Sequence, residues 1–322
     1  MDRGGAMRRL FSLALLAWLP LISQANPTNF GGQYQACLST CVTLDKPALR
    51  VVALNWSAAE MLLSLGVEPV GVTEIKGYKK WQTNHPQLNA SAVEIGRRQE
   101  PNLTEIAKLK PDVIIGYDFR HQRLYSMLKR IAPTLLYQQF PRVDQPDFRY
   151  FDYAQTVFRH LALLTGKVDQ GQAQLNAMHA TLAQLKQQLA SAGLGGKSVT
   201  YGKFIGMGYG LRIFSNPSLA GSVATALGLD YHWRNTLPGK DFVHLQLEQL
   251  PHIHDTHLLL AGNQTDSERM TTSPVWPFLP FVKTHQFSSV EPLWSFGGPA
   301  SITRMAKAFT QSLLDWQEAN RG

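Results

Sequence analysis

Several aromatic side chains lie where predicted strands or helices end, and rings at such positions can form the wall of a ligand cleft. Trp56 follows a predicted buried strand, and Trp81 lies in a polar connection. Trp294 and Phe296 lie together in the segment PLWSFGG. Large rings on loops offer much apolar area to a ligand, although a loop tryptophan equally often fills a core. These four rings are therefore candidate ligand-binding residues, with core packing as the alternative.

Arg98 adds a polar group to this set. It lies in the segment GRRQEPNL, and its guanidinium is a planar fork of donors that suits the oxygen atoms of a chelate. The alternative is a surface ion pair with Glu100, two residues further along the chain. Arg98 is therefore the candidate that would supply hydrogen bonds where the aromatic rings supply apolar contact.

A histidine cluster near the C-terminal third suggests a metal site. His252, His254 and His257 stand with Asp255 between a predicted helix end and a buried strand. Polar residues are ordinary at that kind of surface position, and no additional carboxylate is evident that would orient a metal-binding imidazole. We therefore expect surface histidines here, and no metal bound directly by the protein.

Signatures of common enzyme classes are absent from the sequence. It contains no G-x-S-x-G elbow, Walker loop, H-E-x-x-H motif or dinucleotide-binding glycine pattern. The glycine-rich run at residues 206–210 lacks the Lys-Ser/Thr of a phosphate-binding loop, so we predict a loop at a strand end. The net charge of +8 is spread over single basic residues and pairs such as Lys79-Lys80, which argues against nucleic-acid binding. The sequence thus favours a binding protein over an enzyme.

The elements that would position these residues alternate between strand and helix. Strands are predicted near residues 50–55, 69–72, 112–116 and 134–137, with helices at 102–109 and 122–131 between them. The stretch 150–192 is helical, with a break near Thr165-Gly166, and α/β alternation then resumes. In that second half we predict strands at 198–201 and 258–262, and helices at 219–227, 245–250 and 300–316.

This pattern predicts an α/β fold in which two α/β lobes are joined by one long helix. The expected divisions are an N-terminal lobe at 49–150, a linking helix region at 151–193 and a C-terminal lobe at 194–322. A cleft between two lobes is where small-molecule sites commonly lie. The candidate residues above should meet there.

The N-terminus indicates export. Arginines precede the apolar run LFSLALLAWLPLI, and Ser-Gln-Ala follows it, so we predict a signal peptide at residues 1–25 with Met7 as an alternative start. A loop-like leader should then cover residues 26–48. Cys37 and Cys41, the only two cysteines, can form a local disulfide in an oxidising compartment. Cys37 lies too far beyond the apolar run to favour a lipid-anchored cysteine.

An ordered series of segments resembles a known family. The segments are RVVALNWSAAEMLLSLG (50–66), GVT (71–73), GRRQEPNL (96–103), LKPDVII (109–115) and RIAP (130–133). Together they are similar to the iron-siderophore-binding proteins of ABC importers, and most similar to the periplasmic ferric hydroxamate (ferrichrome) type. The resemblance covers residues 49–314. It implies the class III periplasmic binding protein fold with a helical backbone, as the alternation of elements also suggests.

The same resemblance implies roles for particular residues. Trp56, Trp81 and Arg98 occupy matching motif positions in the first lobe, with the arginine directed at hydroxamate oxygens. Trp294 and Phe296 match an aromatic pair that ends in tyrosine in relatives, so Phe296 lacks that hydroxyl. Relatives have a first-lobe tyrosine, and its counterpart in this chain is open among Tyr117, Phe119 and Arg120. They also have a second-lobe tryptophan, for which Phe242 is the open candidate.

The function that the resemblance implies is periplasmic capture of a ferric hydroxamate siderophore by a monomeric protein of a Gram-negative bacterium. The siderophore fills the coordination sphere of iron, so no cofactor and no protein ligand to the metal are expected. Delivery would be to an inner-membrane ABC permease with its ATPase, through acidic surface residues of which Glu248 is a second-lobe candidate. Haem, cobalamin or a ferric catecholate is an alternative ligand, and Lys79, Lys80, Arg97 and Arg120 favour the anionic catecholate. A siderophore hydrolase is a further alternative without a supporting motif.

Overall fold

The computed structural model describes residues 34–321 apart from residues 84, 206–209, 235 and 263. The predicted signal peptide and the first part of the predicted leader lie outside the described residues, as does most of the glycine-rich run 206–210. Within the described range, no helix is both long and apolar enough to cross a membrane.

The first lobe is built on a five-stranded parallel sheet with strand order β5-β4-β3-β6-β7. Because the strands run in parallel, their carboxyl ends all meet at one edge of the sheet. The strands are β3 (Val51–Ala53), β4 (Gly71–Val72), β5 (Val93–Glu94), β6 (Val113–Tyr117) and β7 (Thr134–Tyr137). The helices are α1 (Trp56–Ser64), α2 (Ile75–Trp81), α3 (Leu103–Lys108), α4 (Asp118–His121) and α5 (Tyr125–Ile131), with a 3-10 turn η1 (Gln122–Leu124).

The second lobe contains a mixed sheet with order β11-β9-β8-β12-β13, and β10 pairs with β8. Strand β9 is antiparallel to both β8 and β11, whereas β10, β12 and β13 run in parallel. The strands are β8 (Ser198–Ile205), β9 (Gly210–Phe214), β10 (Asp230–Tyr231), β11 (Phe242–Gln246), β12 (His257–Ala261) and β13 (Phe287–Val290). The helices are α8 (Leu219–Ala226), α9 (Gln264–Thr271), α10 (Pro280–Lys283), and the 3-10 turns η3 (Leu247–His252) and η4 (Trp276–Phe278).

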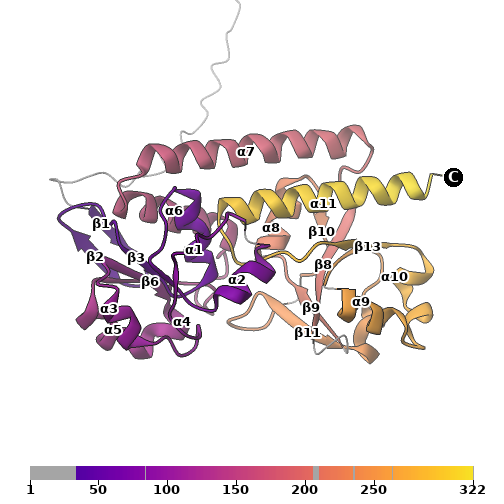
Figure 1. Cartoon of the computed structure of the whole chain (residues 1–322). Helices are drawn as coiled ribbons and strands as arrows, with labels where there is room; N and C mark the ends of the chain where they lie inside the picture. Colours follow the sequence, from indigo (N-terminus) through magenta and orange to yellow (C-terminus); the bar gives the residue numbers. More distant parts are fainter. Residues whose placement is uncertain (1–33, 84, 206–209, 235, 263, 322) are drawn as a thin grey trace, which may run out of the picture.

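The linking region 151–193 contains two helices, α6 (Tyr150–Leu164) and α7 (Val168–Ser191), separated at the break predicted near Thr165-Gly166. The break falls at Gly166, whose φ of +66° is a left-handed conformation that glycine adopts without strain. The backbone N–H of Lys167 donates to the carbonyl of Ala162 (2.7 Å), which closes the end of α6. The 24-residue α7 therefore forms the long helix of the fold and packs beside the terminal helix α11 (Pro299–Ala319), above both lobes (Figure 1).

The two lobes share one apolar core. Met61 of α1, Phe158 of α6, Met178 of α7 and Met305 of α11 are all buried in a single continuous cluster of apolar side chains. The prediction of two α/β lobes spanned by a long helix is thus confirmed, and the lobes are joined by packing as well as by the chain.

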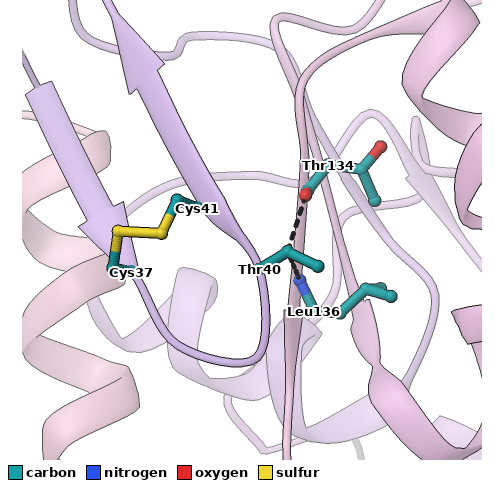
Figure 2. The surroundings of a disulfide bond; sticks show 5 residues. All are labelled: Cys37, Thr40, Cys41, Thr134 and Leu136. Carbon is teal, nitrogen blue, oxygen red and sulfur yellow. Dashed lines mark hydrogen bonds between the residues drawn. A yellow bond between two sulfur atoms is a disulfide. The ribbon is translucent and has the colours of Figure 1, made fainter.

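Part of the predicted leader forms a β-hairpin, which corrects the expectation of a loop through residue 48. Strands β1 (Tyr34–Cys37) and β2 (Cys41–Leu44) pair antiparallel, and a disulfide joins Cys37 to Cys41 across the turn (Figure 2). At the hairpin tip, the Thr40 hydroxyl donates to the carbonyl of Thr134 (2.9 Å) and accepts from the N–H of Leu136 (2.8 Å). The hairpin forms because its tip gains backbone partners on β7, a contact that no local pattern reveals.

The helix predicted at 245–250 is also corrected. Leu245 belongs to β11, all five residues of which pair with β9. The following residues form the 3-10 turn η3, which contains Pro251. Proline cannot donate a backbone hydrogen bond inside an α-helix, and the antiparallel partner outweighs local helical periodicity. Strand β9 was not predicted, and β8 extends four residues beyond its predicted end.

Candidate ligand-binding cleft

A cleft of about 390 Å³ lies between the lobes and takes its walls from both of them. Among the nine candidate residues from the sequence, eight line it: Trp56, Trp81, Arg98, Phe119, Arg120, Phe242, Trp294 and Phe296. Six lining residues were not predicted: Gln139, Phe140, Lys203, Phe204, Ile205 and Arg212. Most of the first-lobe members follow the carboxyl ends of the parallel strands, so the sheet itself gathers residues that are distant in sequence.

Tyr117 is the candidate that the structure places elsewhere. It is the last residue of β6 and is 2% exposed, beneath the cleft rather than in its wall. Its hydroxyl lies 2.5 Å from the hydroxyl oxygen of Ser57, and burial raises the pKa of Tyr117 to about 12. The side chain lies within the apolar core because the strand has not yet ended at this residue. The next residues, which begin α4, are the ones that reach the cleft.

Arg98 lies against Trp56 and is oriented by Glu74. The Arg98 Nε donates to Glu74 Oε2 (2.7 Å), and its backbone N–H donates to Glu74 Oε1 (3.1 Å). Its guanidinium carbon lies 3.6 Å from the centre of the Trp56 ring, a cation–π contact. The two terminal nitrogens of Arg98 have no hydrogen-bond partner within the described part of the chain. Glu100, the partner considered from the sequence, pairs instead with Arg97 at 3.9 Å.

The Trp56 ring is itself fixed in place. It is the first residue of α1, and the side chain of Asn55 caps that helix by accepting from the N–H of Ala58 (2.8 Å). The indole Nε1 donates to the carbonyls of Thr73 and Glu74, each at 3.2 Å. The ring on which Arg98 stacks therefore cannot rotate freely, and both are ordered before any ligand is present.

A buried histidine supports the backbone of Arg98. The Nδ1 of His121 accepts from the N–H of Tyr117 (3.0 Å), so the ring carries its proton on Nε2 and donates to the carbonyl of Arg98 (2.9 Å). Burial lowers the pKa of His121 to about 4, so the imidazole is neutral near pH 7. Sequence reasoning missed this residue, since its role depends on α4 and the loop after β5 lying side by side.

Trp294 and Phe296 reach the cleft from the loop between β13 and α11. The Trp294 Nε1 donates to Ser57 Oγ in the first lobe (2.9 Å), and the Trp294 ring packs edge-on against Trp56 at 4.8 Å. The backbone carbonyl of Phe296 accepts from the hydroxyls of Ser57 and Tyr150. This loop belongs to the second lobe but is held by hydrogen bonds to the first.

Glu60 of α1 forms hydrogen bonds to the other end of the loop between β13 and α11. Its buried carboxylate accepts from the N–H groups of Gly298 (3.0 Å) and Ser301 (2.9 Å), from the Ser301 hydroxyl (2.5 Å) and from Gln82 Nε2 (2.7 Å). A carboxylate at the N-terminus of α11 is favourably placed relative to the helix dipole. Burial raises the pKa of Glu60, and these hydrogen bonds lower it in part. The aromatic pair of the cleft is thus anchored across the lobe junction.

The rest of the first-lobe wall holds polar atoms without partners. Arg120 lies 4.9 Å from the Phe119 ring centre, and its buried Nε has no partner among the described residues. Gln139 is 4% exposed, and its side-chain oxygen is likewise unpartnered within the described ranges. Burial and the nearby Arg98 lower the pKa of Arg120. Buried polar atoms usually have partners, so this wall retains unused capacity for hydrogen bonds.

Lys203 and Arg212 supply cations from the second lobe. The Lys203 Nζ donates to the carbonyl of Leu293 (2.8 Å) and lies 4.3 Å from the Trp81 ring centre. The Arg212 guanidinium carbon lies 4.2 Å from the Phe242 ring centre. Burial, with a contribution from Arg212, lowers the pKa of Lys203 to about 7. The signal that could have found both residues is a single basic residue within an otherwise apolar strand.

The histidine cluster lies away from the cleft. His254 Nδ1 pairs with Asp255 Oδ2 at 2.8 Å on the surface, and His257 is buried with its ring against Trp316. Among the residues that the structure describes, no group of three or more potential metal ligands occurs. Glu248 is exposed in η3, a position compatible with a docking role.

Comparisons with known proteins agree with this architecture. A family model described as "Periplasmic binding protein" matches residues 51–292. The Fe(3+) dicitrate-binding periplasmic protein FecB of Escherichia coli is 29% identical over 77% of this chain and 79% of its own length. The iron(3+)-hydroxamate-binding protein FhuD of the same species is 25% identical over 82% and 86%. The crystal structure of the siderophore-binding protein FhuD from Vibrio cholerae, bound to Fe3+-Desferal, matches with a TM-score of 0.77 and 33% identity, over 83% of this chain and 98% of that one.

Proposed function

Since the chain belongs to the periplasmic binding protein family, we propose that it captures a ferric siderophore in the periplasm and delivers it to an inner-membrane ABC permease with its ATPase. Members of this family bind their substrates without chemical conversion and carry no cofactor, so the iron chelate is cargo. The protein would act as a monomer, and the exposed Glu248 is our candidate for a second-lobe docking residue.

The observation that carries this proposal is the arrangement of Trp56, Arg98 and Trp294 at the lobe junction. The half-buried Trp294 ring provides apolar contact for an organic shell and packs 4.8 Å from the buried Trp56 ring, on which the Arg98 guanidinium lies with its terminal nitrogens open to oxygen atoms. A siderophore that already fills the coordination sphere of iron requires contacts of this kind and no ligand from the protein.

A ferric hydroxamate is the candidate ligand that resemblance to known proteins supports. It is supported by the 33% identity to a protein whose structure holds Fe3+-Desferal and by the aromatic character of the walls. In this chain Phe296 contributes a ring without a hydroxyl, so hydrogen bonds to the hydroxamate oxygens would come from the terminal nitrogens of Arg98.

A negatively charged chelate is the second candidate, and a specific observation favours it. Four cations line the cleft, Arg98 and Arg120 from the first lobe and Lys203 and Arg212 from the second, and none of the described lining residues is acidic. A relative that binds ferric dicitrate matches this chain about as well as one that binds ferric hydroxamate. Ferric catecholates are anionic as well, so the cations do not by themselves select citrate.

Quenching of tryptophan fluorescence in the purified mature chain tests the proposal, because Trp56, Trp81 and Trp294 all line the cleft. The panel consists of ferrioxamine B, ferric dicitrate, a ferric tris-catecholate, haem and cobalamin. We expect saturable quenching by at least one ferric siderophore or citrate chelate, and weaker quenching by the same chelator without iron. Saturation by haem or cobalamin alone, or by no member of the panel, would refute the proposal.

A further inference from the structure

Three basic residues stand side by side across the second-lobe sheet. Lys203 of β8 is directly opposite Arg212 of β9, and Arg212 is directly opposite His244 of β11. Residues directly opposite in antiparallel strands have their side chains on the same face of the sheet. Lys203, Arg212 and His244 therefore form a single row, which we call the basic row, and its first two members line the cleft.

The basic row is an unfavourable arrangement for a free protein. Like charges directly opposite each other in a sheet are destabilising, and neither Lys203 nor Arg212 forms an ion pair with a described carboxylate. The neighbours of Lys203 are Arg212, the Trp81 ring and the Leu293 carbonyl, none of which carries negative charge. Whenever Lys203 is protonated, the sheet therefore holds two cations together with no described anion between them.

Asp241 is an acid whose charge acts on Arg212, and it neutralises the basic row only in part. It is 1% exposed, and neither of its carboxylate oxygens has a hydrogen-bond partner in the described chain. Burial raises the pKa of Asp241 to about 7, although Arg212 opposes this change. Near neutral pH the carboxyl is therefore about half protonated, and its compensation of Arg212 is partial.

His244 positions Arg212. The Arg212 Nε donates to His244 Nε2 (3.0 Å), which requires that this imidazole nitrogen carries no proton. Burial, Arg212 and Lys240 all lower the pKa of His244, in agreement with a neutral ring. The remaining guanidinium nitrogens of Arg212 have no partner among the described residues, and a planar guanidinium binds a carboxylate through two parallel hydrogen bonds.

We infer that the basic row is an anion subsite of the cleft, in which Lys203 and Arg212 bind the anionic oxygens of a negatively charged ferric chelate. This inference rests on the proposed function and specifies the class of its ligand. The oxygens belong to carboxylates in a citrate-type chelate and to catecholates in a tris-catecholate. In either case the ligand supplies the negative charge that the second-lobe wall lacks, and the first-lobe wall contributes Arg98 and Arg120 from the other side.

The test compares Lys203→Met and Arg212→Met with a matched control, Lys197→Met. Lys197 is also a half-buried lysine over a tryptophan, with its Nζ 3.9 Å from the Trp316 ring centre and 3.0 Å from Gln286 Oε1, but it lies outside the cleft. Dissociation constants are measured at pH 6.5 for ferric dicitrate, a ferric tris-catecholate and ferrioxamine B, which carries no negative charge. Circular dichroism and thermal unfolding establish that each variant is folded.

We expect the wild type to bind one of the two anionic chelates at least ~10-fold more tightly than ferrioxamine B, and the preferred one identifies the oxygen chemistry. Each cleft variant should weaken that complex by ~10–100-fold, the usual effect of losing a hydrogen bond to a charged group. Ferrioxamine B binding should change by less than ~3-fold, and Lys197→Met should change nothing.

An equal loss for all chelates, or no loss, would show that the row is structural and overturn the inference while leaving the proposed function intact. If the wild type binds no ferric chelate, the proposed function itself fails. As a further readout, calorimetry of the anionic chelate at pH 8 in two buffers of different ionisation enthalpy should detect uptake of up to about one proton, and Lys203→Met should abolish it.

Discussion

In the first-lobe wall of the cleft, Arg98 lies over Trp56 and is held by Glu74, whereas in the second-lobe wall Lys203 and Arg212 face each other without an ion pair. The first arrangement is ordered before a ligand arrives, because Arg98 Nε, the Arg98 backbone and the Trp56 indole all have partners, and only the terminal nitrogens of Arg98 stay open. The second acquires a counter-charge only from outside the protein. The first-lobe wall thus holds its binding groups in fixed positions, and the second-lobe wall selects among ligands by their charge.

This difference bears on how affinity and specificity divide between the lobes. Ordering a group before binding removes an entropic cost, so a preorganised wall contributes affinity for any chelate of the right shape. A wall that holds like charges together favours ligands that relieve the repulsion and disfavours those that do not. We therefore expect substitutions in the first lobe to affect all ferric chelates, and substitutions in the second lobe to discriminate among them.

The largest expected effect comes from removing the link between the two walls. Glu60→Ala leaves four buried donors at the junction of α1 and α11 without an acceptor, and we expect it to lower the free energy of unfolding by about 3–5 kcal/mol. Urea denaturation measures the loss. Glu318→Ala, an exposed substitution on α11, is the control and should be nearly neutral. An unchanged urea midpoint for Glu60→Ala would contradict the role assigned to this carboxylate.

Arg98→Ala tests the first-lobe wall. It should weaken binding of every ferric chelate by about 1–3 kcal/mol, because a charged hydrogen bond and a cation–π contact are both lost. Arg97→Ala, which removes an exposed arginine paired with Glu100, should leave the dissociation constants unchanged. Fluorescence titration with the preferred chelate and with ferrioxamine B provides both measurements. A loss confined to the anionic chelate would remove the distinction between the two walls.

The pH dependence of binding sharpens the same distinction. The pKa of Lys203 lies at about 7 in the free protein, so the ammonium that an anion requires is increasingly lost above this pH. The dissociation constant of an anionic chelate should therefore rise by up to about tenfold per pH unit between pH 7 and pH 9. Binding of ferrioxamine B should vary little over that range, and Lys203→Met should flatten the profile. A profile that retains its slope in Lys203→Met would assign the titration to another group.

Asp241→Asn should have the smallest effect, and it concerns stability. The pKa of Asp241 is raised from 3.8 to about 7 in the folded protein, so its contribution is fully present below pH 4 and is lost as pH rises through 7. Removing the titratable carboxyl should raise the thermal midpoint at pH 8 by roughly 2–4 °C relative to wild type and change it little at pH 4. Equal shifts at both pH values would indicate a change of packing instead.

The first-lobe wall could be predicted from the sequence because its residues stand in short motifs directly after strands. Trp56 and Arg98 each lie within a few residues of the end of a strand, so a local motif is enough to predict their position in the fold. Arg98 was given the wrong partner, since Glu74 lies 24 residues away and meets it only through the pairing of β4 with β5.

The second-lobe wall could not be predicted in the same way. Lys203 lies beyond the predicted end of its strand, and Arg212 lies in a strand that local pattern did not predict. Their proximity depends on the antiparallel register of β8, β9 and β11, and β11 begins 28 residues after the end of β9. Sequence can show that a basic residue interrupts an apolar strand, but only the register shows that two such residues share one face.

The hairpin at the start of the described chain has a consequence for self-association. Strand β7 is an edge of the first-lobe sheet, and an open edge can recruit a strand from another molecule. Here the N–H of Ser39 donates to the carbonyl of Leu136 (3.0 Å), and the Thr40 hydroxyl accepts from the N–H of the same residue. The disulfide-closed turn thus occupies this edge with side-chain and backbone groups that cannot continue a ladder. Resistance to edge-to-edge aggregation in a crowded compartment therefore depends on residues that do not line the cleft, which selection for ligand binding alone would not preserve.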